Sequence, residues 1–257
     1  MKAWIAIGIT VVLWGCVSQT TLDGRELTQA DAAVEAEQAA RERVALALGY
    51  LERGDLEAAK RNLDRALEHQ PQSESALLTL AYYFEQVQET EQAGAVYRRV
   101  IEAHPNSADA RNNYGVFLCR QGQWPQSERQ LLAAIELPDY AKQGKSYENL
   151  ARCALKAGLA EPAQQYFQMA LKYDPGRTDL WLELAELAFR QQDYPQARLA
   201  LSQYHATNAA SAVTLWLGVE IESRANHKKA AQRFGAQLLV NYPESEQAKA
   251  YRAKNYQ

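Results

Sequence analysis

The sequence contains few of the residues on which metalloproteins and enzymes depend. Its 257 residues include three cysteines and four histidines, and neither set shows the spacing of a metal-binding motif. A glycine-rich phosphate loop, an HExxH helix, a GxSxG turn and the protein-kinase signatures are all missing from the sequence,. We therefore expect no metal, no cofactor, no small-molecule substrate and no enzymatic activity.

An excess of positive charge is also missing. The chain carries 28 Lys and Arg against 31 Asp and Glu, which is a formal net charge of −3. Proteins that bind nucleic acid neutralise phosphates with clustered basic residues. The charge balance therefore excludes nucleic acid from the expected partners.

Long apolar runs are missing except for one at the N-terminus. In residues 1–15 a single basic residue, Lys2, precedes an apolar run from Ala3 to Trp14. A run of about a dozen residues is shorter than the roughly 20 that a membrane-spanning helix needs. The segment is typical of a secretory signal peptide, and a transmembrane anchor is the alternative.

The end of this segment, LWGC at residues 13–16, resembles a bacterial lipobox. In that motif the cysteine is acylated and becomes the new N-terminus, so Cys16 is the expected lipidation site, with an ordinary cleaved signal as the alternative. Several acyl chains, such as palmitate, anchor a protein stably. Val17 and Ser18 follow where an inner-membrane lipoprotein would carry Asp, which implies the periplasmic face of the outer membrane. Residues 16–39 are expected to hold this cysteine, a polar tether and the start of the first helix.

The prolines recur with a period of 34 residues. The four prolines that show it are Pro71, Pro105, Pro175 and Pro243. The intervals between them are one period, two periods plus two residues, and two periods. A 34-residue period is typical of the tetratricopeptide repeat, a pair of antiparallel helices. We therefore predict an all-α fold, a right-handed superhelical solenoid of six tetratricopeptide helix pairs plus a C-terminal capping helix. The predicted repeats lie near 40–73, 74–107, 108–143, 144–177, 178–211 and 212–243, with the cap at 244–254.

Other residues agree with this register. Small residues recur at repeat positions 8, 20 and 27, where the helices of such repeats touch closely, and glycines occupy the turn between the helices of repeats one, three and four,. The third repeat is irregular, because its proline is displaced to Pro138 and two residues are inserted before Tyr147. In the cap, Ala248 and Tyr251 share one side of the helix.

The two remaining cysteines, Cys119 and Cys153, fall inside predicted helices of adjacent repeats. We interpret them as structural residues, because a cysteine in a helix most often behaves as a small buried hydrophobe. An oxidising periplasm would permit a disulfide between them, and the spacing does not decide whether one forms.

The first helix of each pair lines the concave surface of such a solenoid at positions 2, 5, 9 and 12, where side chains are not constrained by packing. In repeats one and two these positions are largely apolar, and in repeat three they include an asparagine with a second one beside it. The predicted partner-binding groove consists of Val44, Leu48, Leu51, Leu78, Tyr82, Asn112 and Asn113. Two alternatives remain open: residues 28–40 fold back over the groove, or the register is wrong by one turn.

The polar part of this surface has further alternatives. Asn112 and Asn113 can bind a partner's backbone or satisfy the loop of the preceding repeat. Repeats four and five carry a mixed set of charges at the same positions, including Lys145, Glu148 and Arg152. We interpret this set as a solvated face or a weak polar contact surface.

The sequence resembles the type IV pilus biogenesis and stability lipoproteins, the PilF/PilW family. The resemblance rests on the lipobox, the tether, six repeats, the segments LGYLERG at 48–54 and NNYGVFL at 112–118, and the irregular junction after repeat three. It implies an outer-membrane lipoprotein pilotin whose partners are pilus secretin subunits and, through the acyl chains, the outer membrane. Its implied role is to promote the localisation and multimerisation of the secretin while itself remaining a monomer.

A second function would use the same parts. A general periplasmic adaptor that tethers cell-wall enzymes or outer-membrane assembly factors also needs a lipid anchor and a tetratricopeptide solenoid. The residues of the predicted groove do not distinguish the two functions.

Overall fold

The computed structural model describes residues 21–22, 25–26 and 29–255. Two short strands, β1 (Thr21–Leu22) and β2 (Arg25–Glu26), pair antiparallel. The helices that follow are α1 (Gln29–Glu52), α2 (Leu56–His69), α3 (Glu74–Gln86), α4 (Thr90–Ala103), α5 (Ala108–Arg120), α6 (Trp124–Ile135), α7 (Gln143–Lys156), α8 (Ala160–Tyr173), α9 (Leu180–Arg190), α10 (Tyr194–Thr207), α11 (Ala212–Arg224), α12 (Lys228–Asn241) and α13 (Glu246–Asn255). Six successive helix pairs and a final single helix confirm the predicted all-α tetratricopeptide fold.

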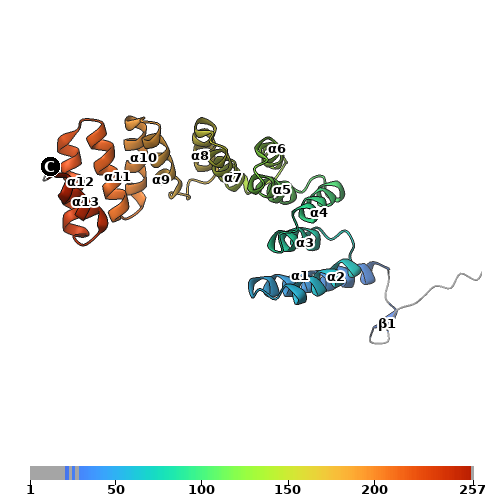
Figure 1. Ribbon diagram of the computed structural model, residues 1–257. Coiled ribbons are helices and arrows are strands. Elements are labelled where there is room, and N and C mark those ends of the chain that lie inside the picture. The colour runs from blue at the N-terminus through green and yellow to red at the C-terminus, as the bar shows by residue number, and fades with distance from the viewer. Residues whose placement is uncertain (1–20, 23–24, 27–28, 256–257) are drawn as a thin grey trace, which may run out of the picture. The chain divides into compact units, whose positions relative to one another are not determined.

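The chain divides into two compact bodies, with the boundary between Gln88 and Glu89. The N-terminal body holds α1 to α3, and the C-terminal body holds α4 to α13. Within the C-terminal body the two helices of each later pair pack against each other, from α5 with α6 to α11 with α12 (Figure 1). The boundary falls inside the second repeat, between its two helices.

A left-handed residue ends the first helix of every pair. Position 15 of the six repeats has φ between 61° and 76° and is occupied by Gly54, Gln88, Gly122, Gly158, Gln192 and Asn226. The next residue closes the turn, since the Asp55 N–H donates to the Tyr50 carbonyl at 2.9 Å. Equivalent bonds recur in repeats three to six, which is the Schellman pattern. Three repeats thus keep this turn without glycine, at a cost of roughly 1 kcal/mol each.

Small residues allow the two helices of a pair to approach closely. Position 8 is buried in repeats one to five and is occupied by Ala47, Ala81, Gly115, Ala151 and Ala185. A Cβ atom on Gly115 would lie 2.6 Å from Cγ of Leu131 on the partner helix. A larger residue at this position would therefore force the pair apart.

The last helix covers the sixth repeat. Ala248 of α13 is fully buried, and Tyr251 packs into the same apolar cluster as Leu215 and Leu238. A Cβ atom on Gly235 of α12 would collide with the Tyr251 ring. The side of α13 that the sequence indicated is thus the side that packs.

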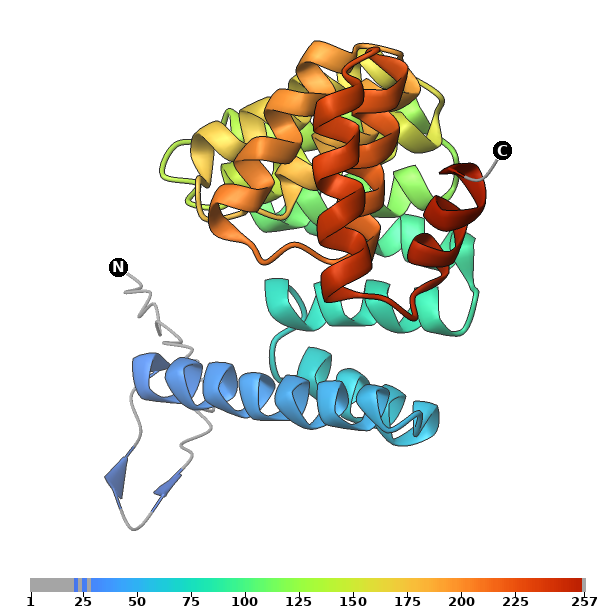
Figure 2. The ribbon, with the colours of Figure 1, turned by 90° about the vertical axis from the view of Figure 1, so that its left-hand side faces the viewer.

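Helix α1 is a single uninterrupted helix of 24 residues (Figure 2). Its N-terminal half is rich in alanine and contains no proline, so nothing ends the helix before the first repeat begins. Residues 29–40 therefore continue α1 instead of folding back over it, and that alternative is wrong. Among the helices of the described chain, none combines the length and the apolar composition needed to cross a membrane.

A buried carboxylate binds three cationic side chains within repeat four. Glu148 of α7 is 3% exposed and accepts hydrogen bonds from Arg152 Nε at 3.0 Å, from Lys145 Nζ at 3.1 Å and from Arg177, which follows α8. Burial raises the pKa of Glu148, but the bonds from the three cations outweigh it and hold the pKa below its ordinary value,. The interpretation of these charges as a solvated or weak polar face is wrong for Glu148, because its carboxylate is buried and bound by cationic side chains of the same fold.

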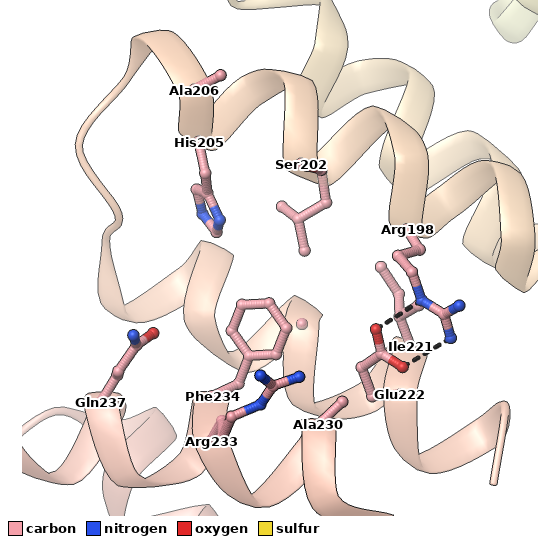
Figure 3. Close-up of a pocket in the computed structure, with 12 residues that line it drawn as sticks. Arg198, Ser202, His205, Ala206, Ile221, Glu222, Ala230, Arg233, Phe234 and Gln237 are labelled. Carbon is pink, nitrogen blue, oxygen red and sulfur yellow. Dashed lines mark hydrogen bonds and ion pairs between the residues drawn. The ribbon is translucent and has the colours of Figure 1, made fainter. Parts of the chain in front are cut away.

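A second buried carboxylate joins repeats five and six. Glu222 of α11 accepts two hydrogen bonds of 2.7 Å from the Arg198 guanidinium of α10 (Figure 3). His227 Nδ1 lies 2.9 Å from Glu222 Oε2. Glu222 thus binds across the junction of repeats five and six, whereas Glu148 reaches repeat five only through Arg152 and Arg177, which also bind Glu183 and Asp179.

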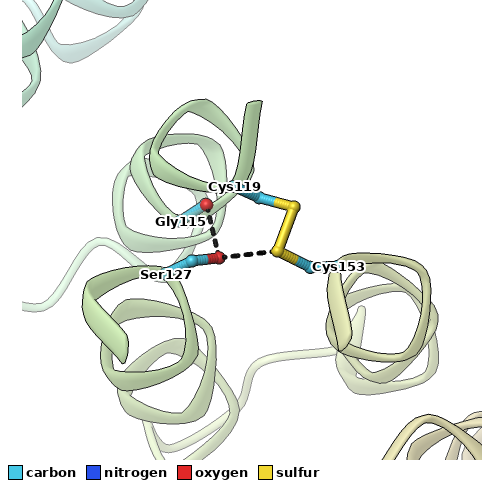
Figure 4. Close-up of a disulfide and its surroundings, with 4 residues drawn as sticks. All are labelled: Gly115, Cys119, Ser127 and Cys153. Carbon is cyan, nitrogen blue, oxygen red and sulfur yellow. Dashed lines mark hydrogen bonds between the residues drawn. A yellow bond between two sulfur atoms is a disulfide. The ribbon is translucent and has the colours of Figure 1, made fainter. Parts of the chain in front are cut away.

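A disulfide joins repeats three and four (Figure 4). Cys119 of α5 and Cys153 of α7 are bonded, and their Cα atoms are 5.7 Å apart. Ser127 lies beside the bridge, and its hydroxyl donates to the Gly115 carbonyl at 2.7 Å. The two cysteines are structural, as the sequence indicated, and the pairing that the spacing left open is decided by the packing of α5 on α7, which brings their Cα atoms within bridging distance,.

Removing the Glu148 charge is expected to destabilise the protein. Glu148→Gln keeps the shape but removes the buried charge that three cations share, and leaves Arg152 and Arg177 with only their more exposed carboxylates, so the free energy of unfolding at pH 7 should fall by about 1–3 kcal/mol,. Because the folded pKa of Glu148 is lowered, its contribution is complete above the ordinary value of 4.5 and is lost as the pH falls below it,. Thermal unfolding between pH 7 and pH 3 should show the wild type and the variant converging.

The matched control is Asp179→Asn, which removes an exposed carboxylate bound to the same Arg177. An exposed ion pair contributes less than about 1 kcal/mol, so this variant should unfold close to the wild type. Equal stability of Glu148→Gln and wild type at pH 7 would contradict the structure.

Loss of the disulfide should lower stability through the unfolded state. The bridge spans 34 residues, for which chain entropy corresponds to about 3–4 kcal/mol. We expect Cys119→Ser to melt at a lower temperature than the oxidised wild type. Dithiothreitol should bring the wild type down to the variant and leave the variant unchanged. Two thiols that react in the denatured protein without prior reduction would show that the bridge is not formed.

Candidate functional site

Four apolar side chains of the predicted groove lie on the first helices of repeats one and two. Leu48 and Leu51 belong to α1, and Leu78 and Tyr82 belong to α3. Each pair is spaced by three or four residues, which places its members on one face of the helix, and α1 packs directly against α3. We call these four residues the α1–α3 strip.

The strip is open to solvent at two of its members. Leu48 and Tyr82 are each 41% exposed, while Leu51 and Leu78 are half-buried. Half-burial holds the two inner side chains in place, and the outer two still present apolar area to water. These three leucines and one tyrosine form an apolar surface whose one polar side-chain group is the tyrosine hydroxyl. They include no acid–base pair for catalysis. This arrangement suits the binding of an apolar segment.

Val44 does not belong to this surface. It is 6% exposed and packs in the core of the N-terminal body with Ala40, Ala66 and Ala76. Its assignment to the groove is wrong, because α1 turns this residue toward both α2 and α3. Leu48 lies one turn further along α1, at the edge of the buried face, where contact with those helices is incomplete.

Leu46 is an exposed residue that the repeat pattern assigned to the core. Its position carries a buried leucine in repeats two, four and five, yet Leu46 is 48% exposed. Repeat one begins the helix pairs of the described chain, so this side of α1 meets no earlier pair there. Repeat one is the first of the series, and this position could have indicated that Leu46 is exposed.

Asn112 has its hydrogen-bonding capacity used inside the C-terminal body. Its Oδ1 accepts from Ser146 Oγ at 2.8 Å and from Asn149 Nδ2 at 3.0 Å, both on α7. Its Nδ2 donates to Asn113 Oδ1 at 3.3 Å. Asn112 therefore joins α5 to the first helix of the following repeat. The sequence had indicated two other hydrogen-bond partners for it, the backbone of a bound protein or the loop of the preceding repeat. Asn113 is half-buried beside it.

The insertion after repeat three supplies a buried residue that repeat alignment missed. Tyr140 is 8% exposed, and its hydroxyl lies 2.9 Å from Ser146 Oγ. Burial raises the pKa of Tyr140 above its ordinary value. Lys142, two residues on, binds Asp109 of α5 at 2.8 Å. Tyr140 thus fills the irregular junction between α5 and α7, while its neighbours in this connection remain exposed.

The predicted lipidation site and signal lie outside the described residues. Cys16, and with it residues 1–15, is therefore not placed by the structure. The strip on α1 and α3 is the part of the predicted site that the structure describes as accessible.

Comparisons with known proteins agree with the repeats. Tetratricopeptide-repeat families match residues 44–108, 96–129 and 154–215. Such families serve as scaffolds for interactions between proteins. The matches lie in both compact bodies and reach all six helix pairs in whole or in part.

Two relatives, one of them known both by sequence and by structure, extend the similarity over most or all of the chain. The type IV pilus assembly protein PilF of Pseudomonas aeruginosa is 30% identical over 254 residues, which are 99% of each chain. A solved structure of Pseudomonas aeruginosa PilF has a TM-score of 0.67 at 29% identity and covers 86% of this chain and 99% of its own.

The crystal structure of PilW, described as a widely conserved type IV pilus biogenesis factor, has a TM-score of 0.65 at 26% identity. It covers 83% of this chain and 98% of its own. Sequence identity over nearly the full length and the shared helix pairs lead to one conclusion: the chain belongs to the PilF/PilW family of tetratricopeptide-repeat proteins of type IV pilus biogenesis.

Proposed function

We propose that this protein is an outer-membrane lipoprotein pilotin, which binds the type IV pilus secretin and promotes its localisation and multimerisation there. The observation that carries the proposal is the solvent-exposed apolar strip of Leu48, Leu51, Leu78 and Tyr82 in a chain of this pilus family. Exposed apolar patches on proteins often mark sites of interaction with another protein. The strip is the proposed contact for a secretin segment.

The proposed mechanism is binding without bond chemistry. An amphipathic secretin segment would cover the strip and remove its apolar area from water, at about 25 cal/mol for each Å² buried. Since Leu51 and Leu78 are already held by the fold, little side-chain freedom is lost on binding. This small loss of entropy allows useful affinity even though the buried area is small.

The proposed anchor adds a concentration effect. Acyl chains on Cys16 would hold the protein at the inner face of the outer membrane, and residues 17–27 would give it reach,. A secretin subunit held near the bilayer meets other held subunits at a raised effective concentration. Assembly of the ring would then be promoted without a catalytic group.

The anchor is tested by Cys16→Ser in the native organism. Without the thiol no diacylglycerol can be attached, so labelled palmitate should not be incorporated and the protein should move from the membrane to the periplasmic fraction. The measurement is fractionation with immunoblotting. Continued sedimentation of the variant with membranes would instead indicate an uncleaved apolar anchor.

The binding function is tested by Leu48→Glu and Tyr82→Glu in a strain that lacks the chromosomal gene. A charge in the strip would have to be desolvated on binding, so capture of secretin by the purified protein should weaken about tenfold or more. In cells, heat-stable secretin multimers in the outer membrane should fall toward the level of the deletion strain.

The matched control is Val240→Glu, which makes the same kind of change at a residue of α12 that is 78% exposed. It should bind secretin as the wild type does, and all three variants should melt near the wild type because the replaced side chains are exposed. Normal multimers in the deletion strain would overturn the pilotin proposal and favour a general adaptor. A large fall in melting temperature for Leu48→Glu would show that the strip is core.

A further inference from the structure

A pocket of about 560 Å³ opens between the last two helix pairs of the C-terminal body (Figure 3). One wall is α10, the opposite wall is α12, and α11 forms the floor with Gly218 and Ile221. The volume is within the range of about 300–1,000 Å³ that is usual for ligand pockets. The walls are second helices of their pairs, so the pocket and the α1–α3 strip use different sets of helices.

The inner part of the pocket is apolar. Leu201 of α10, Ile221 of α11 and Phe234 of α12 line it. The Phe234 ring lies against Gly218, where a Cβ atom would be only 2.7 Å from the ring. The glycine thus lets the ring lie back against α11, and the space in front of the ring stays open for a bulky apolar group.

The polar groups at the pocket divide into two sets. Arg198 is already bound by Glu222, the one carboxylate of the lining. His205 has a buried Nε2 atom without a hydrogen-bond partner, and burial lowers the pKa of its ring below the ordinary value. Arg233 and Gln237 of α12 make no side-chain hydrogen bond or ion pair with any residue that the structure describes.

The charge of the walls has one sign. Helices α10 and α12 contain Arg198, Lys228, Lys229 and Arg233 and no aspartate or glutamate, although acidic residues outnumber basic ones in the chain as a whole. The three residues of α12 in this group have no ion pair in the described part of the chain. Of these four, Arg198 and Arg233 line the pocket, and Arg233 has no ion pair among the described residues. An unpaired arginine beside an apolar floor is complementary to a carboxylate attached to an apolar group.

We propose that this pocket binds a segment of a partner polypeptide that carries a bulky apolar side chain next to a carboxylate. The apolar side chain packs on Leu201, Ile221 and Phe234, and the carboxylate pairs with the Arg233 guanidinium. The unsatisfied His205 Nε2 and the Gln237 amide provide hydrogen bonds to the backbone of the segment. The inference does not depend on the pilotin proposal, because it uses α10 to α12 only.

The test uses three fluorescein-labelled hexapeptides with blocked ends, which differ only at their central pair: Asp-Phe, Asn-Phe or Asp-Ala. Fluorescence anisotropy with the purified protein should show saturable binding of the Asp-Phe peptide. The Asn-Phe and Asp-Ala peptides should each bind about tenfold more weakly, since each lacks one of the two required groups. Binding should also shift the ¹⁵N resonances of the His205 ring.

Two variants complete the test, and both change exposed residues so that the fold is kept. Arg233→Glu reverses the charge at the mouth, and Ser202→Trp fills the pocket from α10; both should abolish binding of the Asp-Phe peptide. Arg129→Glu makes the same charge reversal on α6 and should bind it as the wild type does. Equal binding of all three peptides, undiminished binding by the two pocket variants, or no saturable binding up to about 1 mM would overturn the inference.

Discussion

The close packing of two helices around small residues, followed by a left-handed turn, is the constraint on which the rest of this structure depends. The first helices of repeats one to five are pressed against their partners at an alanine or glycine, as at Gly115 against Leu131. Each of these helices ends at a residue with positive φ, seven residues beyond that contact. Because both conditions return at the same repeat positions, the remaining positions of each first helix keep the same relation to its neighbours. Functional differences between repeats can then come from single side chains.

Where the period is broken, covalent and ionic contacts take over. The insertion after repeat three offsets the register, so Cys119 and Cys153 bond although they occupy different repeat positions, 12 and 10. Tyr140 fills the same junction, and Asn112 is tied to α7. At the following junctions Arg152 binds both Glu148 and Glu183, and Arg198 binds Glu222. The middle of the C-terminal body is thus cross-linked by groups that also reduce its freedom to change shape on binding.

Two surfaces remain that the fold itself does not use. The α1–α3 strip is apolar and lies on first helices, whereas the pocket between α10 and α12 joins an apolar floor to basic walls on second helices. Their chemistry differs, so one segment is not expected to satisfy both. A protein of pilus biogenesis with two unlike surfaces could hold two different segments at once, each by side chains that the packing of the repeats leaves available.

The local pattern of the sequence was sufficient for the repeats, their helix pairs, the cap with Ala248 and Tyr251, and the apolar identity of Leu48 and Tyr82. These depend on period and residue size, which are properties of neighbouring positions. The burial of Val44, the exposure of Leu46, the disulfide and the charge of Glu148 inside the fold were decided by tertiary structure. Each depends on how a helix is rotated against its neighbours and which atoms that rotation brings together. A rotation of a few tens of degrees moves a side chain from core to surface, and a repeat pattern does not contain that angle.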